Sequence, residues 1–221
     1  METHKLNLFD FGPLHDSRKE IDQTLRNLPL QTGDILYRAS NAKGPLGLPF
    51  SRLVGVITKS AYSHAAIVLM DENEPLVLEV NDQGTLKLRL IDWLDTCYTN
   101  QFSVFRLKKI DDELKSKIEN EIQKIFHDDP DYDFTFSDPN KFYCTEAVSY
   151  IYSKVGTPLV EPETIKEVAK PYAYWILKIG SWLFSIFSDT ALNFNQKMYY
   201  VGNSKKGMMS SSKTYEVYRH N

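Results

Sequence analysis

Cysteine is scarce in this sequence, which has only Cys97 and Cys144 among 221 residues. Two cysteines cannot form a disulfide framework, and their spacing excludes a CxxC unit, so this usage fits a reducing compartment. The sequence also lacks an HExxH motif, paired cysteine and histidine spacings, and a glycine-rich phosphate loop. We therefore expect no metal ion, no nucleotide and no other cofactor.

An excess of charge of one sign is missing as well. The formal net charge is -3, so the composition implies no basic face. The basic pairs Lys108-Lys109 and Lys205-Lys206 are too short to predict a nucleic-acid surface and are typical of a solvated face. We expect no nucleic-acid partner.

Long apolar runs are absent too. Residues 1–20 lack an apolar core of secretory length, so we expect no signal peptide and a cytoplasmic protein, with non-classical export left open. The most lipid-like stretch, residues 174–187, contains Lys178 and is shorter than the roughly 20 residues that span a bilayer. This predicts a buried or interfacial helix rather than a membrane span.

The length and composition predict one soluble domain over residues 1–221, with 42% hydrophobic and 25% charged residues. Hydrophobic periodicity predicts strands at 33–39, 64–70, 76–80, 85–90, 102–108 and 215–220, and helices at 17–28, 50–60, 110–127 and 144–155. Strands grouped in the middle of the chain, with helices before and after them, predict an α+β fold with a mostly antiparallel sheet.

Cys144 begins the predicted helix 144–155, whose apolar stripe continues through Ala147, Val148 and Ile151. Free cysteine is among the most buried residue types, so a core thiol is one interpretation. The other is a nucleophile, because the N-terminus of a helix stabilises a thiolate and offers backbone N–H groups to a developing oxyanion. These residues alone leave both interpretations open, and a nucleophile would still need a base.

His64 is the strongest candidate for that base, because it opens the apolar strand 64–70 and strand ends present catalytic side chains rigidly. A hydrogen-bonded structural histidine is the alternative. Glu79 is the sole charge of strand 76–80; if it is buried there it needs a partner, and a hairpin would let it orient the imidazole. An outward-facing carboxylate is the equal alternative. The other histidines lie near the termini or beside an acidic run: His4, His15, His127 and His220.

Three stretches together resemble a known family: GDILYR, TKSAYSHAAIVL and YDFTFSDPNKFYCTEAV. They are similar to the permuted branch of the NlpC-type papain-like cysteine hydrolases, which includes the YiiX-like proteins, over roughly residues 33–155. The resemblance implies a central antiparallel sheet or half-barrel packed against helices, including the nucleophile helix. It also implies a catalytic triad in which Cys144 is the nucleophile, His64 the base and Glu79 the orienting group. Their permuted order is no obstacle, since geometry defines a triad.

The resemblance implies a cysteine peptidase or amidase that cleaves a peptide-like amide through a Cys144 thioester. Two alternatives remain. One is a lipid-directed hydrolase or acyltransferase similar to the lecithin:retinol acyltransferase group, although Tyr143 precedes the cysteine where that group has asparagine. The other is an inactive member that binds a lipid or a peptide. We expect a small peptide-like or lipid-like substrate.

Two features depart from the family pattern. The block YCTE replaces the commoner YCSE, a mild change. Residues 171–195 include an aromatic-rich segment that aligns with no family motif and predicts an extra helix. This helix would cover the site, bind an acyl chain or make peripheral membrane contact through residues 174–187, with plain core packing as the alternative.

Overall fold

The computed structural model describes residues 27–39, 50–81, 84–95, 101–130, 141–169, 174–175, 178 and 194–220. Within these ranges the side chains of residues 50, 52 and 53 are not described. Most of the predicted helix 17–28 and most of the aromatic segment 171–195 lie outside them. Across the described part of the chain, no helix has the length and apolar character that crossing a membrane requires.

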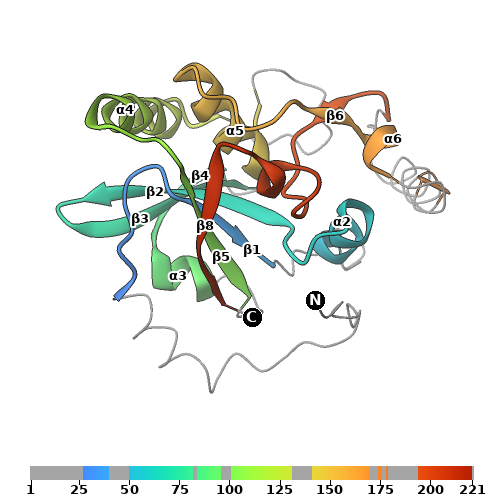
Figure 1. Cartoon of the computed structure of the whole chain (residues 1–221), viewed down its shortest axis with the longest axis horizontal. Coiled ribbons are helices and arrows are strands. Elements are labelled where there is room, and N and C mark those ends of the chain that lie inside the picture. The colour runs from blue at the N-terminus through green and yellow to red at the C-terminus, as the bar shows by residue number, and fades with distance from the viewer. Residues whose placement is uncertain are drawn as a thin grey trace.

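Six antiparallel strands form the central sheet, in the order β4-β3-β2-β1-β5-β8 (Figure 1). Their bounds are β1 Ile35–Arg38, β2 His64–Asp71, β3 Glu74–Asn81, β4 Gly84–Arg89, β5 Phe102–Leu107 and β8 Thr214–His220. Each predicted strand has its counterpart here, so the predicted antiparallel sheet is confirmed. The last strand, β8, pairs with β5 and closes one edge of the sheet.

The helices and the smaller elements are α2 Phe50–Thr58, α3 Leu90–Asp95, α4 Asp112–Asp128, α5 Cys144–Lys154, α6 Ile165–Val168, the strands β6 Glu163–Thr164 and β7 Lys197–Met198, and the 3-10 helix η2 Met208–Ser210. The sequence predicted α2, α4 and α5. It missed α3 because the alternation of strand 85–90 continues through Leu90, which instead begins that helix. Six residues are too few to show helical periodicity.

Side-chain alternation along the strands divides the core between the two faces of the sheet. Ala65 and Ile67 of β2 belong to a buried cluster that α4 and α5 cover. Ala66 and Val68 of the same strand face the opposite cluster, which contains Trp93 of α3. Figure 1 shows α4 and α5 on one side of the sheet and α3 on the other. The sheet therefore separates the helix that carries Cys144 from the helix that carries Trp93.

The hairpin between β2 and β3 is tighter than the sequence suggests. The polar stretch 71–75 was predicted to separate the strands, but Asp71 pairs with Glu74 and only two residues form the turn. These residues, Glu72 and Asn73, both have positive φ, at 45° and 74°. Two-residue turns of this kind match the twist of the strands and need positive φ at both positions.

A buried ion pair fixes the start of β1. The Asp34 side chain is fully buried, and its carboxylate accepts hydrogen bonds from Arg106 of β5 at 2.7 and 2.8 Å. It also accepts one from the backbone N–H of Gln31 at 3.0 Å. The preceding Gly33 has φ of 90° and donates its N–H to the carbonyl of Val68 at 2.9 Å. These contacts join β1 to its neighbours β2 and β5.

Replacing Arg106 with Met should lower the free energy of unfolding by about 3 kcal/mol, because it leaves the Asp34 carboxylate buried without its cation. Urea unfolding measures the loss. Lys117→Met is the matched control, since the ion pair of Lys117 with Glu113 on α4 lies at the surface and should contribute nothing measurable. Equal changes in the two variants would contradict this role of Asp34.

Candidate active site

The end of β1 and the start of β2 lie side by side, and this brings two polar side chains together. Arg38, the last residue of β1, pairs in register with His64, the first residue of β2. Glu79 lies near the end of β3, which pairs with β2 on its other side. The hairpin therefore brings His64 and Glu79 together, as the sequence predicted, and Arg38 joins them from the third strand.

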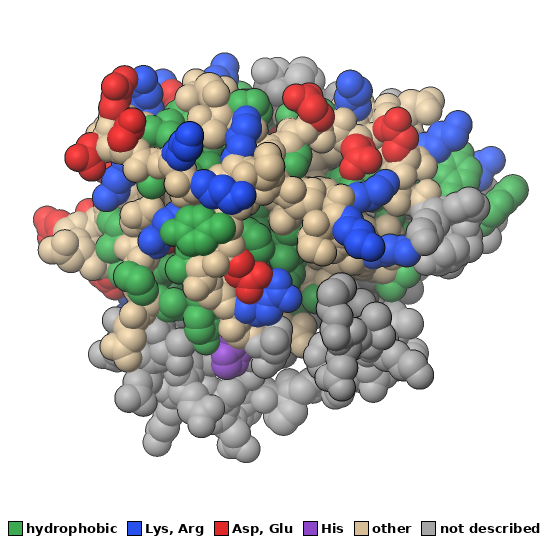
Figure 2. All heavy atoms as spheres, in the orientation of Figure 1, with side chains coloured by type: hydrophobic (Ala, Val, Ile, Leu, Met, Phe, Trp, Pro, Cys, Tyr) green, Lys and Arg blue, Asp and Glu red, His purple; other side chains and the backbone are tan. Residues whose placement is uncertain are grey.

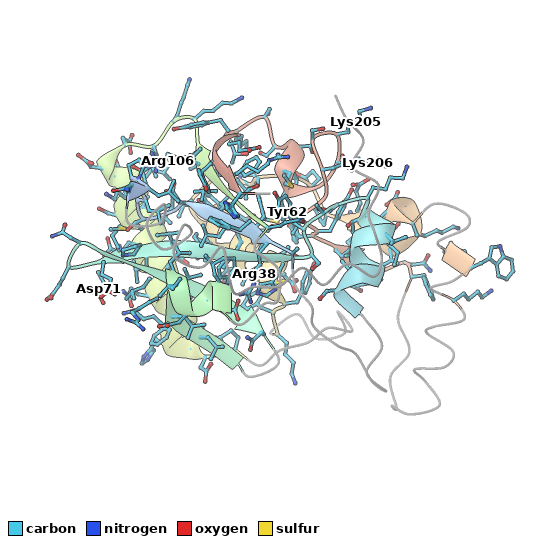
Figure 3. All side chains as sticks on the ribbon, turned by 90° about the horizontal axis from the view of Figure 1, so that it is seen from below. Arg38, Tyr62, Asp71, Arg106, Lys205 and Lys206 are labelled. Atoms are coloured by element: carbon cyan, nitrogen blue, oxygen red, sulfur yellow. The ribbon has the colours of Figure 1, made fainter. Side chains whose placement is uncertain are left out.

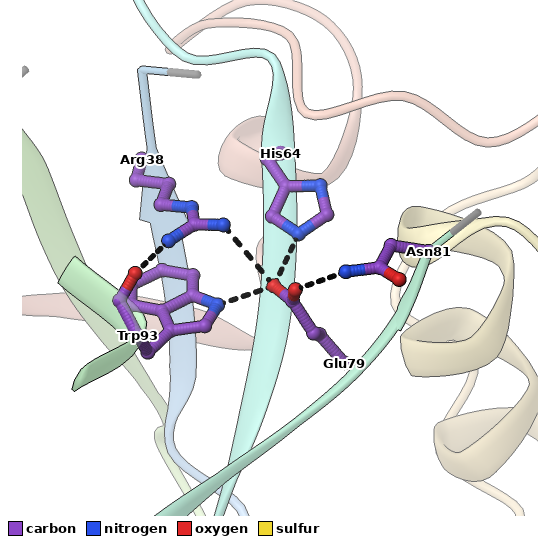
Figure 4. A network of polar contacts seen from close by, with 5 residues as sticks. All are labelled: Arg38, His64, Glu79, Asn81 and Trp93. Atoms are coloured by element: carbon purple, nitrogen blue, oxygen red, sulfur yellow. Dashed lines mark hydrogen bonds and ion pairs between the residues drawn. The ribbon is translucent and has the colours of Figure 1, made fainter. Parts of the chain in front are cut away.

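The Glu79 carboxylate is the centre of this cluster (Figure 4). Its Oε2 atom contacts His64 Nε2 at 2.6 Å and Arg38 Nη2 at 3.3 Å, and it accepts a hydrogen bond from Trp93 Nε1. Its Oε1 atom accepts a hydrogen bond from Asn81 Nδ2 at 2.6 Å. The residue is 2% exposed, so the interpretation of Glu79 as an outward-facing strand carboxylate is wrong.

These contacts keep Glu79 ionised. Burial by itself raises the pKa of a carboxyl group because it disfavours the charged form. Here the charge and hydrogen bond of His64, the Arg38 guanidinium and the Trp93 N–H outweigh burial and lower the pKa of Glu79 to about 2. The carboxylate is therefore a permanent negative charge beside the imidazole.

Cys144 reaches this cluster from the opposite face of the sheet, as the first residue of α5. Cys144 is partly exposed, whereas Ala147 and Val148 on the same helix are buried in the core. Burial raises the pKa of the thiol, but the neighbouring His64 charge, a hydrogen bond with His64 and the backbone of Ala65 together lower it. A thiol beside an imidazole fits a nucleophile better than a core residue.

The His64 imidazole lies between the thiol and the carboxylate. Burial lowers its pKa, but the charges and hydrogen bonds of Cys144 and Glu79 outweigh that effect and raise the pKa to about 9. The lowered pKa of Cys144 and the raised pKa of His64 together favour a thiolate–imidazolium ion pair near neutral pH. Because Nε2 contacts Glu79, the other ring nitrogen, Nδ1, is the one left for Cys144.

The start of α5 is anchored to the segment that follows β7. The Tyr143 hydroxyl accepts a hydrogen bond from the backbone N–H of Tyr199 at 2.6 Å, and the Thr145 hydroxyl donates to the Tyr199 carbonyl at 2.9 Å. Tyr143, the N-cap residue, places no side-chain hydrogen bond on the N–H groups of the helix. The departure from YCSE to YCTE keeps the hydroxyl that this anchor uses.

Sequence reasoning missed Arg38, Trp93 and Asn81. Arg38 carried a usable signal, because it is a charged residue at the end of the apolar strand 33–39. Trp93 carried none, since α3 was not predicted. Asn81 follows Glu79 by two residues, on the same face of β3, but lies just beyond the predicted strand 76–80.

The remaining titratable candidates lie elsewhere or outside the described residues. His127 is exposed in the last turn of α4, and His220 on β8 lies against the ring of Phe102, with centroids 5.7 Å apart. His4, His15 and Cys97 fall outside the described ranges. Nowhere in the described part of the chain do three or more His, Cys, Asp or Glu side chains form a group that could hold a metal ion.

Comparison with known proteins identifies a family and a similar solved structure. The sequence model of a family described as permuted papain-like amidase, YaeF/YiiX, C92, matches residues 29–215. Among solved structures, the chain is similar to the metalloprotein YiiX from Escherichia coli O157:H7, at 20% sequence identity and a TM-score of 0.67. That alignment covers 86% of this chain and 97% of the other, and at this identity it shows the fold alone. No curated protein matches the chain.

Cys144 should react with iodoacetamide at pH 6 faster than an ordinary thiol does, because its pKa is lowered. A Cys97→Ser background removes the other cysteine, so the measured alkylation belongs to Cys144 alone. Adding His64→Gln should slow the reaction at pH 6 at least about tenfold, since the imidazolium no longer stabilises the thiolate. Unchanged alkylation in the double variant would contradict the ion pair.

Proposed function

Since the chain belongs to the permuted papain-like amidases, a family of cysteine hydrolases, we propose that it cleaves a peptide-like amide bond through a thioester on Cys144. The observation that carries this proposal is the chain of contacts from the Cys144 thiol through His64 to the buried carboxylate of Glu79. A nucleophile, a base and an orienting group in hydrogen-bonding sequence are the parts that acyl transfer through an activated thiol requires.

Acylation begins from the thiolate–imidazolium pair. The Cys144 sulfur attacks the amide carbonyl carbon, and the N–H groups at the start of α5 stabilise the negative charge that develops on the carbonyl oxygen. The imidazolium of His64 then gives its proton to the leaving nitrogen as the C–N bond breaks. Glu79 stabilises that imidazolium through the 2.6 Å contact and holds the ring orientation.

Deacylation uses the same groups in reverse. The neutral imidazole of His64 takes a proton from water, and the resulting hydroxide attacks the thioester carbonyl. The C–S bond breaks, the carboxylic acid product leaves, and the proton on His64 restores the ion pair with Cys144. A hydrolase needs no further cofactor for this cycle.

A lipid-directed hydrolase or acyltransferase is the second candidate. One observation favours it: Trp175 is 63% exposed, with the Lys178 ammonium 5.5 Å from its ring centroid. Exposed aromatic and basic side chains suit the interface of a membrane, so peripheral contact through residues 174–187 stays part of this candidate. The inactive alternative is less well supported, because thiol, imidazole and carboxylate adjoin one another.

A nucleic-acid partner is not part of the proposal. The face drawn in Figure 2 intersperses acidic and basic side chains among the described residues, as the net charge of -3 suggests. Lys206, from one of the two basic pairs in the sequence, lies 3.8 Å from the carboxylate of Glu163.

Cys144→Ala should abolish turnover and leave the fold intact, because the thiol is a reacting group and the residue is only partly buried. Purified protein is assayed side by side against peptide amides and phospholipid esters, with circular dichroism as the check on folding. Cys97→Ser is the matched control and should retain full activity. Turnover by the Cys144→Ala variant would refute the thioester mechanism, and turnover of esters alone would favour the lipid candidate.

The value of kcat/KM should stay level around neutral pH and fall about tenfold per pH unit above about pH 9, where His64 loses its proton. Unfolding must be measured over the same range. The pKa of His64 is raised from 6.5 in the unfolded chain, so its contribution to stability is complete below about pH 6.5 and is lost as pH rises through about 9. An alkaline fall centred near pH 6.5 in a folded enzyme would contradict the raised pKa.

A further inference from the structure

Two buried side chains contact Glu79 without a part in the hydrolytic steps. Arg38 is 4% exposed and Trp93 is fully buried. The Arg38 guanidinium lies 4.1 Å from the centroid of the Trp93 ring and donates a hydrogen bond to the Trp93 carbonyl. Both side chains also donate to Glu79 Oε2, the oxygen that contacts His64. Arg38, Trp93 and Glu79 thus form a closed ring of contacts.

This ring fixes the carboxylate in one orientation. Three donors converge on Oε2, and Asn81 Nδ2 holds Oε1, so the group cannot rotate about its Cγ–Cδ bond without breaking several hydrogen bonds. Hydrogen bonds to a charged acceptor are about twice as strong as neutral ones. A single hydrogen bond to His64 would tolerate rotation of both partners, whereas this arrangement does not.

Trp93 also contacts both partners of the Glu79–His64 pair. Its indole ring is stacked on the His64 imidazole, with centroids 6.3 Å apart and 28° between the planes. Leu90 and Leu94 anchor α3 in the apolar cluster beneath the sheet, which fixes the ring that lies between them in sequence. Because the side chains of Glu79 and His64 are only 1% and 13% exposed, the attraction between carboxylate and imidazolium is stronger than it would be at the surface.

We propose that Trp93 and Arg38 are positioning residues. They hold the Glu79 carboxylate in the orientation that turns Nδ1 of His64 toward Cys144. This inference rests on the proposed function, since it assigns the two residues a task in that mechanism. Both donate hydrogen bonds to Glu79 Oε2, and Trp93 also lies against the His64 ring. The same charge and hydrogen bonds lower the pKa of Glu79, so the orienting group stays ionised at acidic pH as well.

The test measures alkylation of Cys144 by iodoacetamide as a function of pH, in the Cys97→Ser background. Trp93→Phe keeps an aromatic ring on α3 but removes the N–H donor, and Arg38→Lys keeps the charge but loses the stacked planar group. Each variant should slow alkylation at pH 6 about tenfold and move the midpoint of the profile to higher pH, because one hydrogen bond to a charged group is lost.

A double-mutant cycle separates positioning from general stability. If Trp93 acts through Glu79, then adding Trp93→Phe to Glu79→Gln should slow alkylation less than about twofold further. Arg106→Lys is the matched control, because Arg106 makes a similar ion pair with Asp34 near the opposite end of β1 (Figure 3). It should leave the alkylation profile unchanged, both alone and in combination with Glu79→Gln.

Two results would overturn the proposal. One is a Trp93→Phe variant that is less stable to urea but has an unchanged alkylation profile, which would make Trp93 structural only. The other is an equal effect of Trp93→Phe with and without Glu79. Alkylation needs no substrate, so these outcomes are distinct from failure of the proposed hydrolysis. Where turnover is measured, the positioning role predicts a fall in kcat with KM unchanged.

Discussion

The site depends on one interaction, the contact between the Glu79 carboxylate and the His64 imidazole at 2.6 Å. A carboxylate that is 2% exposed is costly unless it is paired and hydrogen-bonded. The fold meets this requirement with an imidazolium, a guanidinium, an indole N–H and an amide, which come from three strands and one helix (Figure 4). The charge that these donors stabilise then raises the pKa of His64 and so favours the thiolate of Cys144.

The permuted papain-like fold places this network at the end of a strand, where the two faces of the sheet can meet. His64, Arg38 and Trp93 gather on the side of α3, while Cys144 comes from α5 on the other side. The residue before the first residue of a strand is not part of the sheet. The side chain of that first residue can therefore contact groups from both faces. A position in the middle of β2 would be enclosed by one face alone.

Helices and strands with a strong hydrophobic period could be predicted from their own residues. The apolar stripe of α4 and the alternation along β4 each reflect burial on one side of an element, and the structure confirms both. Prediction failed where tertiary contacts override the local pattern. Leu90 continues the alternation of β4 but begins α3, and residues 71–75 look like a polar loop but pair as strands apart from a two-residue turn.

The sequence by itself determined which groups are available: one cysteine at the start of a helix, one histidine at the start of a strand, and one carboxylate within an apolar strand. Each is a local pattern that propensity and hydrophobicity can reveal. Only the tertiary structure decided that Glu79 is buried rather than outward, and that Arg38 and Trp93 are its partners. The reason is physical, because the ionisation of a buried group depends on the charges and donors around it, and folding brings these together from distant parts of the chain.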